Sequence, residues 1–158
     1  MEKLLKLLEN NARLSFEELA VMLDTTPEDV AKMIDLAREQ GIIKGFNTLI
    51  DWTKTDVNHV EAVIELHVSP KKNRGFDEIA QTIASFEEVE SVNLMSGGYD
   101  LMLLIKGKTF QEVALLVAKR ISPLDDVLST ATHFVLRTYK RDGKLFLAEE
   151  KDEREYTV

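Results

Sequence analysis

Residues 60–68 read VEAVIELHV. Apolar side chains occupy every second position, and Glu61, Glu65 and His67 lie between them. A period of two residues is typical of a strand that has one face in a protein core and the other toward solvent. The Ser-Pro pair that follows is expected to end the strand, because proline has no amide hydrogen to donate to a sheet.

Five further elements follow this strand along the chain. The spacing of their apolar residues predicts a helix over 76–83, strands over 89–95 and 99–106, a helix that opens with a capping box of Thr109 and Glu112, and a long strand over 128–139. Residues 141–144, RDGK, are expected to extend the last strand into a hairpin. The order βαββαβ is that of a ferredoxin-like α+β domain, with four antiparallel strands and both helices on one face.

The second face of this predicted sheet has no cover. The strand over 99–106 is apolar on both faces, with Leu101, Leu103 and Ile105 on one face and Met102 and Leu104 on the other. An apolar sheet face has to be buried, and a second copy of the chain is the simplest partner. The pattern therefore predicts a homodimer.

The N-terminal part of the chain has the apolar spacing of helices. Ser15 and Glu18 form a predicted capping box at the start of a second helix. Thr26 is the predicted N-cap of a third helix, with Pro27 at its first position and Gly41 just after its end. Three short helices, the last two joined by a tight turn, are typical of a helix-turn-helix.

Composition and period divide the chain into segments. Residues 42–51 are rich in β-prone side chains and are predicted to form a strand that leaves the helical part. The predicted segments are a helix-turn-helix domain over 1–50, a polar linker over 51–58, a ferredoxin-like domain over 59–148 and an acidic tail over 149–158.

The net charge of the chain is −8, from 28 acidic and 20 basic residues, so no overall basic field attracts nucleic acid or anionic lipid. The sequence has no cysteine, no secretory signal and no apolar run of the roughly 18 residues that a membrane span needs, so a cytoplasmic protein is expected. His59, His67 and His133 are too scattered for a metal site. No catalytic or nucleotide-binding motif is found, so neither a cofactor nor an enzyme is predicted.

The two halves together resemble the Lrp/AsnC (feast/famine) transcriptional regulators. The resemblance rests on the order and spacing of short motifs, which are Asn11-Ala12-Arg13-Leu14-Ser15, Glu18-Leu19-Ala20, Val30 with Ile34, Gly41-Ile42-Ile43, Ser96-Gly97-Gly98-Tyr99-Asp100 and Thr130-Ala131-Thr132. It implies a winged-type helix-turn-helix, a RAM/ACT-like second domain, and dimers that assemble further, often to octamers. It also implies binding to double-stranded DNA and an amino acid or related metabolite as effector.

The third helix is the predicted recognition helix, and it is acidic. Residues 1–50 carry 9 acids and 6 bases, a net charge of −3, so phosphate neutralisation is expected to be weak. The resemblance implies an arginine where this chain has Met33. For Arg13, a surface ion pair is an equally good alternative to DNA contact. The residues expected to contact DNA are Arg13, Thr25, Thr26, Lys32 and Arg38.

The Gly97-Gly98 pair is the best candidate for a ligand site. Backbone amides of successive glycines can converge on a carboxylate, and Asp100 can accept from an ammonium group. The resemblance implies an effector near this turn, at an interface between dimers, and adds Tyr99. The alternative is a plain hairpin turn whose glycines need a positive φ.

Two threonines extend this candidate site. Thr130 and Thr132 share a strand face and can offer hydroxyl groups to the same ligand, although threonine in a strand is commonplace. Asp125-Asp126 is a further possible ammonium acceptor, or a solvated loop.

The leading hypothesis is a DNA-binding regulator whose assembly, and hence operator affinity, responds to an amino acid. A rival hypothesis, motivated by the acidic recognition helix, is an effector-binding oligomer whose helix-turn-helix has little or no DNA affinity. A third is an enzyme that acts on modified tetrapyrroles, since relatives of this architecture do so. Such chemistry would need clustered histidine, arginine and tyrosine in the second domain, and the sequence does not provide them.

Overall fold

The structure is a computed structural model that describes residues 1–69 and 75–147. The chain folds as two compact units, Met1–Ile50 and Asp51–Val158. The predicted acidic tail over 149–158 lies outside the described residues. Within the part that is described, every helix is too short or too polar to cross a bilayer.

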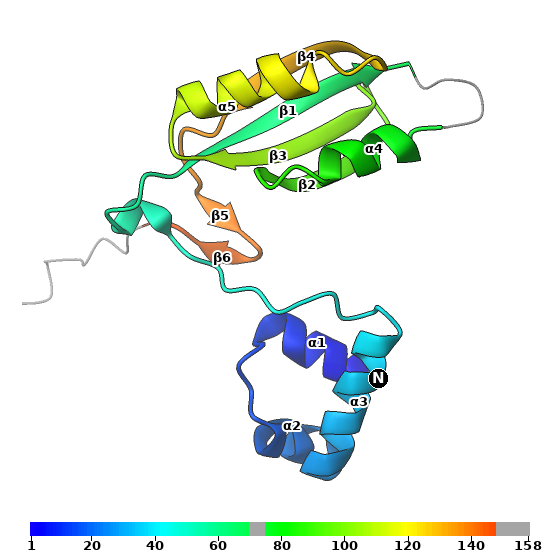
Figure 1. The fold of residues 1–158 in the computed structure, drawn as a ribbon. Coiled ribbons are helices and arrows are strands. Elements are labelled where there is room, and N and C mark those ends of the chain that lie inside the picture. The colour runs from blue at the N-terminus through cyan, green and yellow to red at the C-terminus, as the bar shows by residue number, and fades with distance from the viewer. Residues whose placement is uncertain (70–74, 148–158) are drawn as a thin grey trace, which may run out of the picture. The chain divides into compact units, whose positions relative to one another are not determined.

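Three helices form the first unit, and they are α1 (Glu2–Asn10), α2 (Phe16–Leu23) and α3 (Pro27–Glu39) (Figure 1). The predicted capping box is confirmed. Ser15 Oγ accepts a hydrogen bond from the Glu18 amide at 3.1 Å, and the Glu18 carboxylate accepts one from the Ser15 amide at 2.8 Å. All three helices contribute to one apolar core, whose buried residues are Leu4, Leu8, Leu19, Ala20, Val30 and Ile34.

The segment after α3 differs from the prediction. Gly41 has a positive φ of 67° just past the helix, as predicted, and the amides of Ile42 and Ile43 donate to the Ala37 carbonyl at 2.8 and 3.1 Å. No strand is present over residues 42–51, so the predicted strand is wrong and residues 1–50 contain no wing. A strand needs a hydrogen-bonded neighbour, and no described segment of the chain pairs with these residues.

The second unit begins with a short 3₁₀ turn, η1 (Trp52–Lys54), and continues as the predicted βαββαβ unit. Its elements are β1 (Val60–Val68), α4 (Asp77–Ala84), β2 (Val89–Leu94), β3 (Leu101–Gly107), α5 (Phe110–Leu116) and β4 (Val127–Phe134). The four strands form one antiparallel sheet in the order β2-β3-β1-β4. The predicted α+β class and element order are therefore confirmed.

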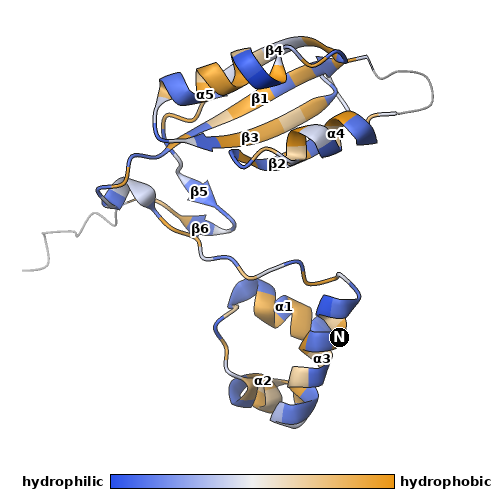
Figure 2. Cartoon of the chain, viewed as in Figure 1, coloured by the Kyte–Doolittle hydropathy of each residue, from blue (hydrophilic) through white to orange (hydrophobic). Residues whose placement is uncertain are grey.

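The core of this unit lies between the sheet and its two helices. Apolar residues concentrate on the central strands β1 and β3 (Figure 2). Glu61 is expected toward solvent but is buried, so the predicted exposed face of residues 60–68 is wrong at that position. The predicted core face is confirmed, because Ala62, Ile64 and Leu66 are fully buried. They belong to one cluster with buried residues of β3, α4 and α5, so both helices cover the same face. Met102 and Leu104 alternate with the buried residues of β3 and are only half-buried.

The C-terminal part of the unit departs from a single long strand. β4 ends at Phe134, opposite Ala62 of β1, and one further backbone bond joins the strands, from the Val135 amide to the Glu61 carbonyl at 2.9 Å. A separate hairpin follows, made of β5 (Lys140–Arg141) and β6 (Lys144–Leu145). Its two-residue loop, Asp142-Gly143, has φ values of 47° and 76°, as a type I′ turn requires. The predicted hairpin is thus confirmed, but it does not continue β4.

The helix predicted from Thr109 also differs from the prediction at both of its ends. Thr109 Oγ1 caps it by accepting from the Glu112 amide at 3.1 Å. The Glu112 carboxylate accepts from the Lys108 amide at 2.8 Å rather than from the cap residue, so only half of the predicted capping box forms. After Leu116 the helix continues as one π-helical turn, η2 (Val117–Ile121).

Candidate functional site

Three of the five residues predicted to contact DNA lie close to the N-terminal end of α3, and they are Thr25, Thr26 and Lys32. Thr26 Oγ1 accepts from the Asp29 amide at 3.2 Å and caps the helix, as predicted. The Asp29 carboxylate lies 3.4 Å from Lys32 Nζ. The hydrogen bond from Thr26 lowers the pKa of Asp29 below its usual value, and Lys32 and then Thr25 lower it further. Thr25, Thr26 and Lys32 therefore surround an ionised carboxylate, which neutralises the charge of Lys32.

The two predicted arginines lie elsewhere in the unit. Arg13 lies in the loop between α1 and α2, and Arg38 in the last turn of α3, about 18 Å along the helix axis from Thr26. Both side chains are exposed, and neither has an ion-pair partner among residues 1–69 and 75–147. Met33 is half-buried against the helical core, so it adds nothing to the exposed face of α3.

The loop between β2 and β3 is fastened to the neighbouring strand by Asp100. The Asp100 carboxylate accepts from the Val68 amide at 2.9 Å, and the Asp100 amide donates to the Leu66 carbonyl at 2.9 Å. Gly97 and Gly98 are exposed, and a Cβ added at either would meet no atom within 4 Å. Neither glycine has a positive φ, so the alternative of a turn that requires glycine conformation is wrong. The loop presents open backbone at one end of the sheet.

Within a single copy of the chain, Thr130 and Thr132 do not lie next to this loop. They pair with Leu66 and Ile64 of β1, so they share the helix-covered side of the sheet, and Thr130 Oγ1 lies 3.4 Å from Ser122 Oγ. β1 separates β4 from β3, which puts these threonines about 10 Å from the start of β3. The structure therefore places the two predicted parts of the ligand site on different strands without joining them.

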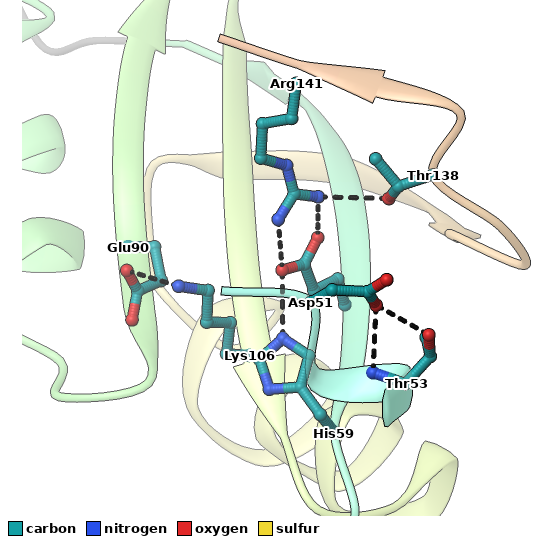
Figure 3. A network of polar contacts seen from close by, with 8 residues as sticks. Asp51, Thr53, His59, Glu90, Lys106, Thr138 and Arg141 are labelled. Carbon is teal, nitrogen blue, oxygen red and sulfur yellow. Dashed lines mark hydrogen bonds and ion pairs between the residues drawn. The ribbon is translucent and has the colours of Figure 1, made fainter. Parts of the chain in front are cut away.

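A polar cluster that the sequence pattern did not predict lies around Glu61 of β1 (Figure 3). Glu61 is only 6% exposed, and Arg141 of β5 donates to both of its carboxylate oxygens, one of them at 2.8 Å. His59 Nε2 lies 2.9 Å from the same carboxylate, and the His59 ring stacks on Trp52. Arg141 also donates to Thr138 Oγ1 at 3.3 Å. The cluster fastens the C-terminal hairpin to β1.

The charges of this cluster support one another. Burial by itself raises the pKa of Glu61, but the hydrogen bonds and charges of Arg141 and His59 outweigh burial, and the net result is a pKa below the usual value. The hydrogen bond to Glu61 raises the pKa of Arg141 in turn. Glu61 is therefore an ionised, paired carboxylate and is not poised to exchange a proton.

No metal centre is found in the part of the chain that the structure describes. No group of three or more histidine, aspartate or glutamate side chains there is arranged to hold an ion. His59 contacts Glu61, and His133 lies 3.6 Å from Glu65. Two residues do not complete a coordination sphere.

Comparison with known proteins matches nearly the whole chain to transcriptional regulators. Residues 61–145 match the model of the Lrp/AsnC ligand binding domain. The chain is 42% identical to the uncharacterized HTH-type transcriptional regulator YugG of Bacillus subtilis, over 96% of this chain and 92% of that protein. These similarities define the class as helix-turn-helix transcriptional regulators with a ligand-binding domain, and not enzymes. The chain belongs to the Lrp/AsnC family, so the predicted resemblance is confirmed.

Two solved structures share the fold. One is the feast or famine regulatory protein of Mycobacterium tuberculosis complexed with L-methionine, with a TM-score of 0.72 and 20% identity over 89% of this chain and 92% of that chain. The other is a transcriptional regulator of Neisseria meningitidis, also with L-methionine, with a TM-score of 0.70 and 20% identity over 88% of this chain and 89% of that chain.

Proposed function

We propose that this regulator binds double-stranded DNA through its first unit and an amino acid or related metabolite through its second. The observation that carries the proposal is that one chain holds both kinds of site. Its first unit has an exposed and capped third helix, and its second unit has an open glycine loop at the end of the sheet of a domain that matches a ligand-binding family. The proposed place of action is the cytoplasm, where the DNA is.

The DNA contacts proposed are Thr25, Thr26 and Lys32 at the start of α3, with Arg13 and Arg38 on phosphates. Hydroxyl and ammonium groups at the start of a recognition helix suit base edges and phosphates. A dimer presents two such helices to successive major grooves, so the operator should be nearly palindromic. Lys32 is paired with Asp29, so each unit contributes few free positive charges.

Selection of random duplex DNA by the purified protein, at low and at physiological salt, tests this half of the proposal. We expect a nearly palindromic sequence that survives the higher salt. No enrichment at either salt, with and without a panel of amino acids, would exclude DNA binding. The matched variants are Arg13→Gln, expected to reduce the salt dependence by about one phosphate contact, and Lys6→Gln on the outside of α1 as a control.

The proposed effector site consists of Gly97, Gly98, Tyr99 and Asp100. The amides of the loop would receive a carboxylate, and Asp100 would receive an ammonium group at the oxygen not used by the Val68 amide. The L-methionine complexes of two relatives support an amino acid as the ligand class. Thr130 and Thr132 would reach this ligand from a second copy of the chain.

Thermal unfolding with and without each amino acid tests the effector site. A ligand that binds only the folded protein raises the melting temperature. Asp100→Asn keeps an oxygen for the Val68 amide but removes the charge, so the shift should disappear while the melting temperature without ligand stays nearly unchanged. Asp77→Asn, at the start of α4, is the control. No shift with any amino acid, or the same shift in Asp100→Asn, would contradict the assignment.

The proposed assembly is a homodimer that associates further, up to an octamer. The sheet face away from the helices carries the half-buried side chains of Val63, Met102 and Leu104, which a partner would cover. Light scattering after size-exclusion chromatography measures the mass directly. A monomer at micromolar concentration would contradict the proposal.

The second candidate function is an effector-binding oligomer that has little DNA affinity. The Asp29–Lys32 pair and the net charge of −3 over residues 1–50 favour it, because DNA affinity depends on neutralising phosphates. Amino-acid binding without any enriched DNA sequence is the result that would select this function.

A further inference from the structure

A cavity of about 400 Å³ lies in the second unit where β3 ends and α5 packs on it. Its volume is within the range of small-molecule sites. One wall is apolar and is formed by Val113, Leu115 and Leu116. Gly107 also lines it, about 20 Å along β3 from the end that follows the Gly97-Gly98 loop. The cavity is therefore separate from the proposed effector site.

The helix above this cavity has an unusual conformation. α5 ends at Leu116 and continues as the π-helical turn η2, and both cations of that turn, Lys119 and Arg120, line the cavity. Single π-helical turns are rare and are frequent at functional sites. α5 packs closely on the end of β3, because a Cβ on Gly107 would lie only 2.8 Å from Val113 Cγ2. The approach of α5 to this glycine shapes the cavity.

Nearly all charged groups that line the cavity already have partners. Arg120 donates to both oxygens of Glu88, at 2.8 and 3.1 Å, and its guanidinium lies 4.3 Å from the Phe86 ring centre. Lys106 pairs with Glu90 at 2.9 Å.

The remaining two charged groups differ from each other. Glu112 accepts from the Lys108 amide at 2.8 Å. Lys119 has no ion-pair or hydrogen-bond partner within residues 1–69 and 75–147. Among the residues that the structure describes, the cavity lining thus has one cation without a partner, Lys119, together with an apolar wall and acids that already accept hydrogen bonds.

From this arrangement we infer that the cavity binds a small monocarboxylate with an apolar body and no ammonium group. The carboxylate pairs with Lys119, and the apolar body contacts Leu115 and Leu116. An α-amino acid fits less well, because both oxygens of Glu88 are taken by Arg120 and Glu112 offers its ammonium group only the one oxygen that the Lys108 amide does not use. The ligand class therefore differs from that of the proposed effector site.

The test compares three probes of similar size on the full chain: 4-methylpentanoate, 4-methylpentanamide and leucine. Binding is followed by backbone amide chemical shifts in NMR titrations. We expect the carboxylate to bind at least about tenfold more tightly than the amide, as a charge-assisted hydrogen bond implies. The shifts should map to residues 106–120. Leucine should shift those residues less than the carboxylate does.

Two variants and a control separate ligand contact from loss of folding. Lys119→Gln should weaken carboxylate binding about tenfold and leave amide binding unchanged. Leu115→Gln, at a half-exposed wall position, should weaken binding of both probes. Lys140→Gln, an exposed lysine of β5, should change neither. The thermal unfolding midpoints of all three should match that of the unaltered protein.

Several results would overturn the inference. These are no saturation by about 10 mM, beyond the range of even weak ligands, equal affinity for the amide and the carboxylate, and unchanged carboxylate affinity in Lys119→Gln. Shifts confined to residues 95–100 would overturn it as well, because they would assign the carboxylate to the other end of the sheet.

Discussion

Two ion pairs of this chain use the same chemistry in opposite surroundings. In the first unit, Lys32 and Asp29 are 77% and 52% exposed; in the second unit, Arg141 and Glu61 are 29% and 6% exposed. Water screens the first pair, which therefore contributes almost nothing to folding stability. The second pair is largely desolvated, so removing either partner leaves a buried charge without compensation.

The burial of each ion pair decides whether it affects folding stability or the charge on the surface. The buried pair holds the C-terminal hairpin on β1 and acts on stability. The exposed pair lies at the start of the proposed recognition helix and acts on the charge that DNA would meet. Loss of the buried pair should lower the free energy of unfolding, and loss of the exposed pair should change the affinity for DNA.

The largest expected effect is that of Arg141→Met, which leaves Glu61 buried and unpaired. We expect the free energy of unfolding to fall by about 3 kcal/mol. Urea unfolding followed by the fluorescence of Trp52, the single tryptophan, measures it, because Trp52 stacks on His59 beside Glu61. Lys140→Met, its exposed neighbour, should change the same quantity by less than about 0.5 kcal/mol.

A double variant sharpens this result. Replacing both partners, as Glu61→Leu with Arg141→Met, should recover most of the loss, because an apolar pair of similar volume can substitute for a buried ion pair. If the double variant is as unstable as Arg141→Met alone, the hairpin is held by the specific hydrogen bonds rather than by charge compensation.

The second prediction concerns pH. The folded-state pKa of Glu61 is below its usual value of 4.5, so its pairing stabilises the fold above that pH and the contribution is lost as the pH falls through the lowered value. Stability between pH 6 and pH 3 should therefore fall more steeply in the unaltered protein than in Glu61→Gln. Asp29→Asn should change the slope much less than Glu61→Gln does, because the pKa of Asp29 is also lowered but water screens its pair with Lys32. Parallel slopes for all three proteins would contradict the assignment.

The exposed pair should show the opposite behaviour, with a change in DNA binding and none in stability. Asp29→Asn should leave the unfolding midpoint nearly unchanged but strengthen DNA binding, because it removes a negative charge and frees Lys32. The slope of log affinity against log salt should become steeper by about one. Asp35→Asn, on the same helix, removes a charge without freeing Lys32 and should have the smaller effect. Fluorescence anisotropy with the selected operator measures both.

The smallest expected effect is that of Lys32→Gln in the unaltered protein. Because Asp29 already neutralises Lys32, DNA affinity should fall by less than about threefold, or roughly 0.7 kcal/mol. The same substitution in the Asp29→Asn background should cost more, and the difference between the two costs is the coupling of the pair. Equal costs would mean that the pair does not persist on DNA.

Most of the fold could be predicted because its signals are local. The caps at Ser15 and Thr26 and the Asp142-Gly143 turn each depend on residues close in sequence, and all three are confirmed. The strand expected over residues 42–51 was wrong because pairing depends on a distant neighbour that β-propensity does not supply.

Long-range contacts in the candidate sites could not be predicted. Glu61 and Arg141 lie 80 residues apart, and nothing in an alternating strand distinguishes this glutamate from Glu65. The Asp100 tether to Val68 spans 32 residues. The faces of Thr130 and Thr132 follow from the register of β4 on β1, which a single sequence does not contain.

The central place of β1 has a consequence for synthesis. Because β1 pairs with β3 on one side and β4 on the other, its second partner is complete only when residue 134 has left the ribosome. The three helices of Met1–Ile50 make mostly local contacts and can fold well before that. Until then the backbone N–H and C=O groups on one edge of β1 are unpaired and can form hydrogen bonds with strands of other chains. Arg141 emerges later still, so all four strands of the sheet are available for pairing before the Glu61 carboxylate can meet the Arg141 guanidinium.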